Sequence, residues 1–370
     1  MPAAVYVVKI GSNVLTDEQG SLRQDVMAER VRELALLARE GNSVVLVSSG
    51  AISCGLGALP LAGRPTETVE LQAASAVGQG RLFHRYSELF GEEGVTTAQV
   101  LLTSFDIAAR SQYLNARNTL MKLFEWDIVP VINENDTTSA DEIRYGDNDF
   151  LAAQVAILAK AGMLILLTDT DGLYTSDPSK DPGARHIEEV SDWSLMREIE
   201  AGGTGSAVGS GGMKSKVVAA EMATTANIEV VIASGFRKNV ITAAAAGEKT
   251  GTRFLPMKAS MSSFKLWLKY GRPSSGVVLV DAGAAEALGR GGKSLLPAGI
   301  VAVEGEFAAG EAVDVVHDEA GQRRVIGKGV TSYTAEELRR IKGMKSHQVT
   351  KLLPHVEEEV IHRDYFVLED

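Results

Sequence analysis

The sequence predicts an α/β fold, a three-layer αβα sandwich around a mainly parallel sheet, followed by a small, mostly β domain. Three observations near the N-terminus support the sandwich. Residues 5–10 form a β-branched run typical of a buried strand. Residues 25–39 carry apolar side chains at helical spacing and end before Gly41, and residues 44–47 form a second apolar run. A strand, a helix and a strand separated by Gly/Ser turns indicate a βαβ unit of a parallel sheet.

The same alternation continues through residue 232. We expect further helices at residues 71–90, 111–124, 150–161 and 214–225. We expect further strands at residues 97–102, 128–132, 163–167 and 229–232. A sheet built this way is buried on both sides, so helices must cover both of its faces.

The pattern changes after Gly247, where the helical periodicity ends. A polar stretch with Met and Ser, residues 250–263, is predicted to be a linker. Short strand-like runs separated by glycines follow at residues 277–280, 300–304, 312–316 and 324–327. We therefore expect two domains, an α/β domain over residues 1–262 and a small β domain over residues 263–370.

Composition limits the classes of function. The chain has 370 residues, 45% of them hydrophobic, and a formal net charge of −11. Residues 261–370 carry 14 basic and 16 acidic side chains, and the preceding residues carry 23 and 32, so neither part has the basic surplus typical of RNA-binding proteins. The net charge also argues against a membrane-surface protein. The single cysteine, Cys54, and the lack of a signal-peptide pattern or a long apolar run predict a cytoplasmic protein.

The densest cluster of polar side chains lies at residues 133–149. It contains six carboxylates, three side-chain amides and a single cation, Arg144. Like charges at this density repel one another unless something balances them. The segment follows a predicted strand and leads from Asp149 directly into a predicted helix, a place where α/β proteins bind ligands. It is either a solvated acidic loop or a site for an ammonium group, a metal ion or both.

Three other predicted strands also end in polar segments. Lys9 lies at the end of the first strand, beside a glycine, so its ammonium group either meets an anion or extends to solvent. Residues 48–51 and 168–174 offer hydroxyl, carboxylate and backbone groups, although tight turns have the same composition.

A fourth segment, residues 202–216, contains six glycines and two lysines just before a predicted helix. The GxxxxGK[ST] spacing of a P-loop is absent. Exposed backbone N–H groups, the helix N-terminus and the charge of Lys216 nevertheless favour phosphate binding over a merely flexible loop.

The residue types missing from these segments indicate the kind of reaction. The six histidines lie outside them, and no HExxH, CxxC or GxSxG motif occurs. Transfer of a phosphoryl group to a carboxylate fits this inventory, because a carboxyl group is already ionised at neutral pH and needs no general base. Two lysines, a metal ion and backbone donors would suffice for alignment and charge neutralisation.

Taken together, these segments resemble the amino-acid kinase family over essentially the whole chain. The matching motifs, in the family's order, are VVKIGSNVL, SSGAISCG, INENDTTSADEIRYGDND, TDTDGLY and GSGGMKSK, of which the stretch ending in GDND is the most specific. The segments VDAGAAEAL, GKSLLPAGI and VEGEFAAGEAVDV resemble a PUA domain. Two departures are Tyr145, where Phe is expected, and Lys214, which adds a cation to the Gly-rich loop.

Within that family the chain is most similar to the enzymes that phosphorylate the side-chain carboxylate of L-glutamate with ATP and Mg²⁺, the first step of proline biosynthesis. The resemblance implies catalytic roles for Lys9, Asp149 and Lys216, with the lysines on the transferring phosphoryl group. The residues implied for glutamate are Ser49, Asn133, Asp136, Asp147 and Asn148. The residues implied for ATP are Lys9, Thr168, Asp169, Ser210, Gly211, Gly212, Met213, Lys214, Ser215 and Lys216. The direct metal ligands stay open, since phosphate oxygens can supply most of them.

The resemblance also implies feedback inhibition by proline, a dimer or tetramer, and handover of the reactive acyl phosphate to glutamate-5-semialdehyde dehydrogenase. Kinases of the same superfamily that act on aspartate, N-acetylglutamate or UMP are the alternatives. N-acetylglutamate has no free ammonium group to need the acidic stretch, and UMP would call for more basic residues in the acceptor loop.

Overall fold

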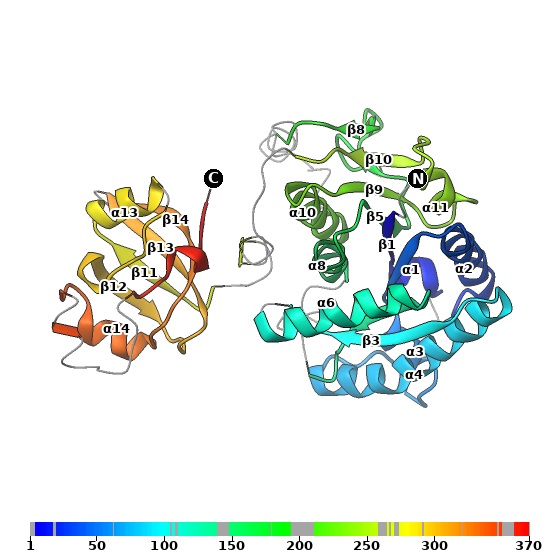
Figure 1. The fold of residues 1–370 in the computed structure, drawn as a ribbon, viewed down its shortest axis with the longest axis horizontal. Helices are drawn as coiled ribbons and strands as arrows, with labels where there is room; N and C mark the ends of the chain where they lie inside the picture. The colour runs from blue at the N-terminus through cyan, green and yellow to red at the C-terminus, as the bar shows by residue number, and fades with distance from the viewer. Residues whose placement is uncertain are drawn as a thin grey trace. The chain divides into compact units, whose positions relative to one another are not determined.

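The computed structural model describes residues 4–17, 20–61, 63–103, 106–107, 110–138, 148–178, 180–193, 211–257, 265, 268–269, 274–290, 292–319, 321–345, 348–349 and 359–369. The chain divides into two compact units, Met1–Ser260 and Met261–Asp370 (Figure 1). The predicted boundary between residues 262 and 263 lies outside the described residues.

The described part of the first unit is built on an eight-stranded sheet with the order β3-β4-β2-β1-β5-β9-β10-β8. The strands are β1 (Val5–Ile10), β2 (Ser43–Ser48), β3 (Thr97–Leu102), β4 (Val129–Glu134), β5 (Met163–Thr168), β8 (Glu189–Val190), β9 (Glu229–Ser234) and β10 (Gly251–Phe254). Neighbouring strands from β3 to β9 are parallel, and β10 runs antiparallel to β9. The predicted mainly parallel sheet is confirmed.

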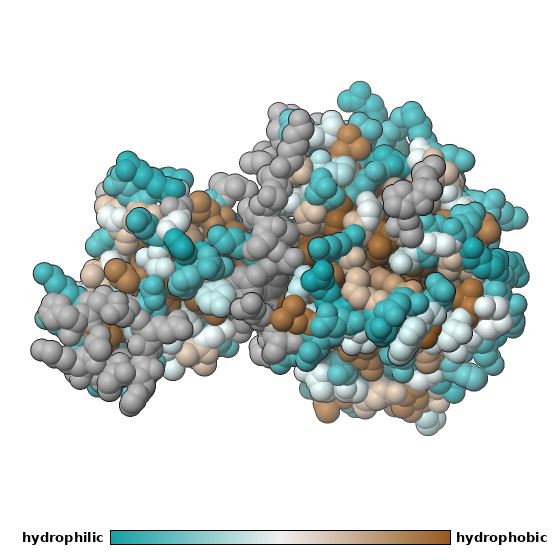
Figure 2. All heavy atoms as spheres, viewed as in Figure 1, coloured by the Kyte–Doolittle hydropathy of each residue, from teal (hydrophilic) through white to brown (hydrophobic). Residues whose placement is uncertain are grey.

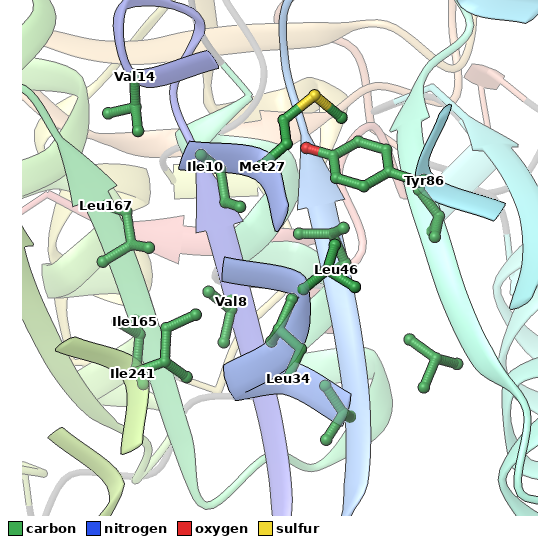
Figure 3. Close-up of a cluster of buried hydrophobic side chains, with 14 of the residues drawn as sticks. Val8, Ile10, Val14, Met27, Leu34, Leu46, Tyr86, Ile165, Leu167 and Ile241 are labelled. Carbon is green, nitrogen blue, oxygen red and sulfur yellow. The ribbon is translucent and has the colours of Figure 1, made fainter. Parts of the chain in front are cut away.

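Helices cover both faces of this sheet, which confirms the three-layer sandwich. The helices are α1 (Ser12–Leu15), α2 (Gln24–Arg39), α3 (Ala51–Leu56), α4 (Thr68–Glu92), α6 (Arg110–Glu125), α8 (Asp149–Ala159), α10 (Gly211–Thr225) and α11 (Val240–Ala245). On one face, Val8 of β1 lies in an apolar cluster with Leu34 of α2, Tyr86 of α4 and Ile241 of α11 (Figure 3). On the other face, α8 and α10 pack against each other and against the sheet (Figure 1).

The predicted linker at residues 250–263 is wrong at its start, because Gly251–Phe254 form β10. Thr252 and Phe254 are buried and alternate with partly exposed residues. The alternation spans only four residues, too few to stand out from a polar stretch. The two-stranded hairpin of β6 (Leu173–Tyr174) and β7 (His186–Ile187) also lies outside the predicted elements.

The second unit contains a five-stranded sheet with the order β12-β11-β13-β14-β15 among its described residues. Its elements are β11 (Gly276–Val280), α13 (Ala282–Gly289), β12 (Ile300–Gly305), β13 (Ala312–Glu319), β14 (Gln322–Val330), α14 (Ala335–Ile341) and β15 (Phe366–Leu368). The four predicted strands are present, each extended at one or both ends. Both helices pack on the sheet through a separate apolar core that includes Leu288, Leu338 and Tyr333.

Figure 2 shows hydrophilic residues over much of the visible surface of both units, with apolar residues in separate groups. This distribution agrees with a chain in which 23% of residues are charged. No helix in the described ranges combines the length and the apolar character needed to cross a bilayer.

Candidate active site

The carboxyl ends of β1, β2, β4 and β5 lie along one edge of the sheet, because these strands are parallel. From the central β1 the chain continues to β2 on one side, whereas β5 lies on the other side. Ligand crevices of open α/β sheets form at such a switch in strand order. The polar segments that follow these four strands in the sequence therefore meet at this edge.

Two buried lysines converge there on one buried carboxylate. Nζ of Lys9 lies 2.7 Å from Oδ1 of Asp149, and Nζ of Lys216 donates to Oδ2 of Asp149 at 2.9 Å. The hydroxyl of Ser215 donates to the same Oδ2 at 2.7 Å. Lys9 and Asp149 are fully buried, and Lys216 is 4% exposed. Burying charges this deeply has a large desolvation cost, which only short and well-aligned ion pairs offset. These contacts are therefore stronger evidence for a functional site than a surface ion pair would be.

Each member of this triad, Lys9, Asp149 and Lys216, comes from a different element. Val8 and Ile10 of β1 face the apolar cluster of Figure 3, so the intervening Lys9 points to the opposite face, where α8 lies. Asp149 is the first residue of α8, where the helix dipole favours a carboxylate. Lys216 lies in the second turn of α10. The sheet and two helix starts thus bring together three residues that are far apart in sequence.

A second buried network adjoins the triad through Asn148, the residue before α8. Nδ2 of Asn148 donates to the backbone oxygen of Ser48 at 2.7 Å and to Oδ1 of Asn133 at 2.5 Å. Asn133 lies in β4, Ser48 ends β2, and all three residues are about 1% exposed. We call Asn133, Asp136 and Asn148 the acceptor network, because the family resemblance implies that these residues hold the acceptor of the phosphoryl group. Its amide groups are held by protein partners in one orientation.

Helix α4 contributes two residues to this network that the sequence analysis missed. Oγ of Ser75 donates to Oδ2 of Asp136 at 2.5 Å, and Nδ2 of Asn133 donates to Oε1 of Gln79 at 2.5 Å. Asp136 and Ser75 are each 2% exposed. The contacts join residues separated by 61 and 54 positions, so no local motif indicates them.

The turn after β2 lies next to the end of β1. Ser49 is buried, and its backbone N–H donates to the carbonyl of Ile10 at 3.2 Å. Gly50 has φ +98°, a left-handed conformation that glycine adopts without strain, and α3 begins at the next residue. The glycine therefore allows the chain to turn sharply into α3 at the sheet edge.

The segment after β5 meets the start of α1. Nδ2 of Asn13 donates to Oδ2 of Asp169 at 2.8 Å, and Oγ1 of Thr168 donates to Oδ1 of Asp169 at 3.0 Å. Burial alone would raise the pKa of the Asp169 carboxyl, but hydrogen bonds from Asn13 and Thr168 and the charge of Lys216 outweigh it and lower that pKa. Asp169 is therefore an anion at neutral pH, and its charge interacts with that of Lys216 in the triad.

Residues 4–234 match the sequence profile of the amino acid kinase family. The chain belongs to the amino acid kinase family. Residues 276–353 match the PUA domain. Proteins named glutamate 5-kinase from Caldanaerobacter subterraneus subsp. tengcongensis and Carboxydothermus hydrogenoformans are 46% and 47% identical to this chain over 363 and 368 residues, which covers 98% of this chain and 97% of each relative. A solved structure of carbamate kinase from Giardia lamblia bound to AMP-PNP has a similar fold, with TM-score 0.51 and 19% identity over 69% of this chain and 99% of that chain.

The two lysines of this kinase's Gly-rich segment differ in position. The described part of the segment begins with α10 at Gly211, and Met213 is half-buried. Lys214 is exposed, whereas Lys216 contacts Asp149, so Lys216 is the lysine of this segment that joins the triad. Of the residues predicted for the site, Asp147 and Ser210 lie outside the described residues.

The described residues around the triad offer a magnesium ion few carboxylate ligands. Within the described residues, no group of three or more His, Cys, Asp or Glu side chains could hold a metal ion. Both carboxylate oxygens of Asp149 already contact Lys9, Lys216 or Ser215. This donor set fits an ion that keeps its waters and phosphate ligands and takes few ligands from protein, as Mg²⁺ commonly does.

Proposed function

We propose that this kinase transfers the γ-phosphoryl group of ATP to the side-chain carboxylate of L-glutamate, giving L-glutamyl 5-phosphate for proline biosynthesis. The observation that carries the proposal is the contact of two buried lysines with Asp149 beside the acceptor network. The relatives named glutamate 5-kinase, which match nearly the whole chain, support the choice of glutamate as acceptor.

On the phosphoryl side, Lys9 and Lys216 would bind the oxygens of the transferring group. The triad brings two ammonium groups to one carboxylate, and these groups would suit the negatively charged oxygens of a phosphoryl group. Asp149 keeps the two ammonium groups together in spite of their mutual repulsion. The ammonium groups are fixed in a buried site before the reaction, so they stabilise charge in the transition state without reorganisation.

On the acceptor side, Asp136 would receive the α-ammonium group of glutamate, and Ser49, Asn133, Asp147 and Asn148 would hold its carboxylates. The amide of Asn148 is oriented in advance by Ser48 and Asn133. Such preorganisation lowers the entropy cost of aligning two reactants. The acceptor carboxylate is ionised at neutral pH, so no residue has to remove a proton from it.

ATP would contact Lys9, Thr168, Asp169 and Ser210, and the start of α10 at residues 211–216. Thr168 donates a hydrogen bond to Asp169 at the end of β5. When bound, Mg²⁺ would neutralise charge on the phosphate oxygens and orient them. Lys9 and Lys216 would supply two ammonium groups for the same phosphate oxygens.

Feedback inhibition by proline, a dimer or tetramer, handover of the product to glutamate-5-semialdehyde dehydrogenase and a cytoplasmic location are further parts of this proposal. The similarity to its family supports them. Proline shares an α-carboxylate and an ammonium group with glutamate, so it could compete for Asp136 and the neighbouring amides. An acyl phosphate hydrolyses in water, which favours direct transfer to the next enzyme.

The proposal is tested by glutamate-dependent ADP release with Mg-ATP, with hydroxylamine present to convert an acyl phosphate into a hydroxamate. We expect hydroxamate from L-glutamate, little from L-aspartate or N-acetyl-L-glutamate, and less when proline is added. ADP release that needs a different acceptor, without turnover of glutamate, would refute the proposed substrate and keep the kinase fold. Turnover of glutamate that proline leaves unchanged would refute only the regulation.

A further inference from the structure

One face of α4 carries polar side chains to which the proposed function assigns no role. Ser75 and Gln79 lie four residues apart and so on the same side of the helix. They bond to different members of the acceptor network, Ser75 to Asp136 and Gln79 to Asn133. A single helix face therefore contacts Asn133 of β4 and Asp136, which follows β4 by two residues.

The position of this face is fixed by very close helix packing. A Cβ atom on Gly78 of α4 would lie 1.8 Å from the backbone oxygen of Ala51, and one on Gly55 of α3 would lie 1.7 Å from that of Ala74. Glycines are needed at both positions because the two backbones touch. Gly78 directly precedes Gln79, and Ala74 directly precedes Ser75, so this packing places both polar side chains.

The bond from Ser75 has the geometry of a strong, charge-assisted hydrogen bond. Its length is 2.5 Å, at the short end for a hydroxyl that donates to a carboxylate. An ionised carboxylate only accepts, so the hydroxyl proton must point to Asp136. A carboxylate has about four lone-pair positions, and the bond from Ser75 occupies one of them on Oδ2 and restricts rotation of the carboxylate.

The bond to Gln79 fixes the amide of Asn133 in the same way. With Nδ2 of Asn133 directed at Gln79, Oδ1 faces Asn148 and also accepts from the backbone N–H of Glu134 at 3.0 Å. A continuous series of hydrogen bonds therefore runs from Gln79 of α4 through Asn133 to Asn148. Asn148 in turn directly precedes Asp149 of the triad.

We propose that Ser75 and Gln79 are positioning residues that set the affinity for an acceptor carrying an ammonium group. Ser75 acts through Asp136, and Gln79 acts through Asn133. The inference rests on the proposed function, because it takes Asp136 as the group that meets the ammonium. The alternative is that α4 makes these bonds only to stabilise the fold, and the two roles predict different kinetics.

The test uses the full chain and the hydroxamate assay with Ser75→Ala and Gln79→Leu. We expect Ser75→Ala to raise the KM for glutamate about tenfold or more, the equivalent of losing a hydrogen bond to a charged group, with kcat changed less than about threefold and the KM for ATP unchanged. Gln79→Leu should raise the same KM by a smaller factor, because its partner is neutral. Thr224→Val is the matched control, since Thr224 is a buried hydroxyl that bonds only to backbone oxygens of α10.

A double-mutant cycle with Asp136→Ala decides between positioning and mere stability. If Ser75 acts through Asp136, Ser75→Ala should change kcat/KM for glutamate by less than about twofold once Asp136 is gone. The same fall in kcat/KM with and without Asp136, or a lower melting temperature with unchanged KM, would overturn the inference. Should Ser75→Ala fail to fold, Ser75→Cys is the substitute: its S–H is a much weaker donor than a hydroxyl, so the KM for glutamate should still rise, and a wild-type KM would refute the inference. A wild type that makes no hydroxamate from glutamate would instead refute the proposed function itself.

Discussion

Replacing Lys216 by methionine tests the proposed role of the triad most directly. The change removes one ammonium group and nearly preserves the length of the side chain. Asp149 keeps its contacts with Lys9 and Ser215, both at 2.7 Å, so its carboxylate stays compensated. We therefore expect the variant to fold and its melting temperature to stay close to that of the wild type.

The size of the kinetic effect follows from the distances in the triad. Nζ of Lys216 lies 2.9 Å from its carboxylate partner, and we expect a phosphoryl oxygen to bind at a similar distance. Two unit charges this far apart interact by about 6 kcal/mol at an effective dielectric constant of about 20. If about half a unit of negative charge develops opposite Lys216 in the transition state, its loss costs about 3 kcal/mol, or roughly a hundredfold in kcat.

The assay is steady-state ADP release over a matrix of ATP and glutamate concentrations. The KM for glutamate should change less than about threefold, because the acceptor network consists of other residues. Lys238→Met, at an exposed lysine after β9, controls for loss of a positive charge. A Lys216→Met enzyme whose kcat stays within about threefold of the wild type, with the effect confined to KM, would refute a transition-state role for this lysine.

Four further outcomes are expected. Asp136→Ala should raise the KM for glutamate by about ten- to a hundredfold and spare that for ATP, and equal effects on both would count against an ammonium site. Gly78→Ala should lower the melting temperature and Gly80→Ala in the same helix should not, since only at Gly78 does an added Cβ meet backbone. Gln154→Leu should stabilise the fold by about 1 kcal/mol in thermal unfolding, because Gln154 is 1% exposed and its amide has no hydrogen-bond partner among the described residues. A loss of stability would show that the amide is needed. A chain ending at Ser260 should retain kinase activity, and a folded but inactive product would show that the second unit takes part in catalysis.

Local signals in the sequence predicted the sheet, whereas the resemblance to the amino-acid kinase family implied that Lys9, Asp149 and Lys216 act together. Alternation along β1 places Lys9 opposite an apolar face, and the change from an acidic segment to apolar helix marks Asp149 as a helix start. The contributions of Ser75 and Gln79 have no such signal. They lie in an ordinary amphipathic helix, and their importance comes from partners more than fifty residues away. β10 was missed for a related reason, since its four residues form a strand only by pairing with β9.

Burial of an ion pair does not by itself distinguish a site from a structural contact, and this unit contains both. Arg30 of α2 is fully buried, pairs with Glu33 at 3.1 Å and donates to the backbone of Arg237, while Glu33 accepts the N–H of Ile241 at 2.7 Å at the start of α11. Those charged side chains connect α2 to α11 on one face of the sheet, and each forms a hydrogen bond with a backbone group. The triad instead brings two lysines from different elements to one carboxylate at the strand ends, and within the described residues its side chains accept no backbone N–H at a helix start as Glu33 does. Because both lysines lie where an open α/β sheet binds its ligand, we propose that the anion they meet is the transferring phosphoryl group.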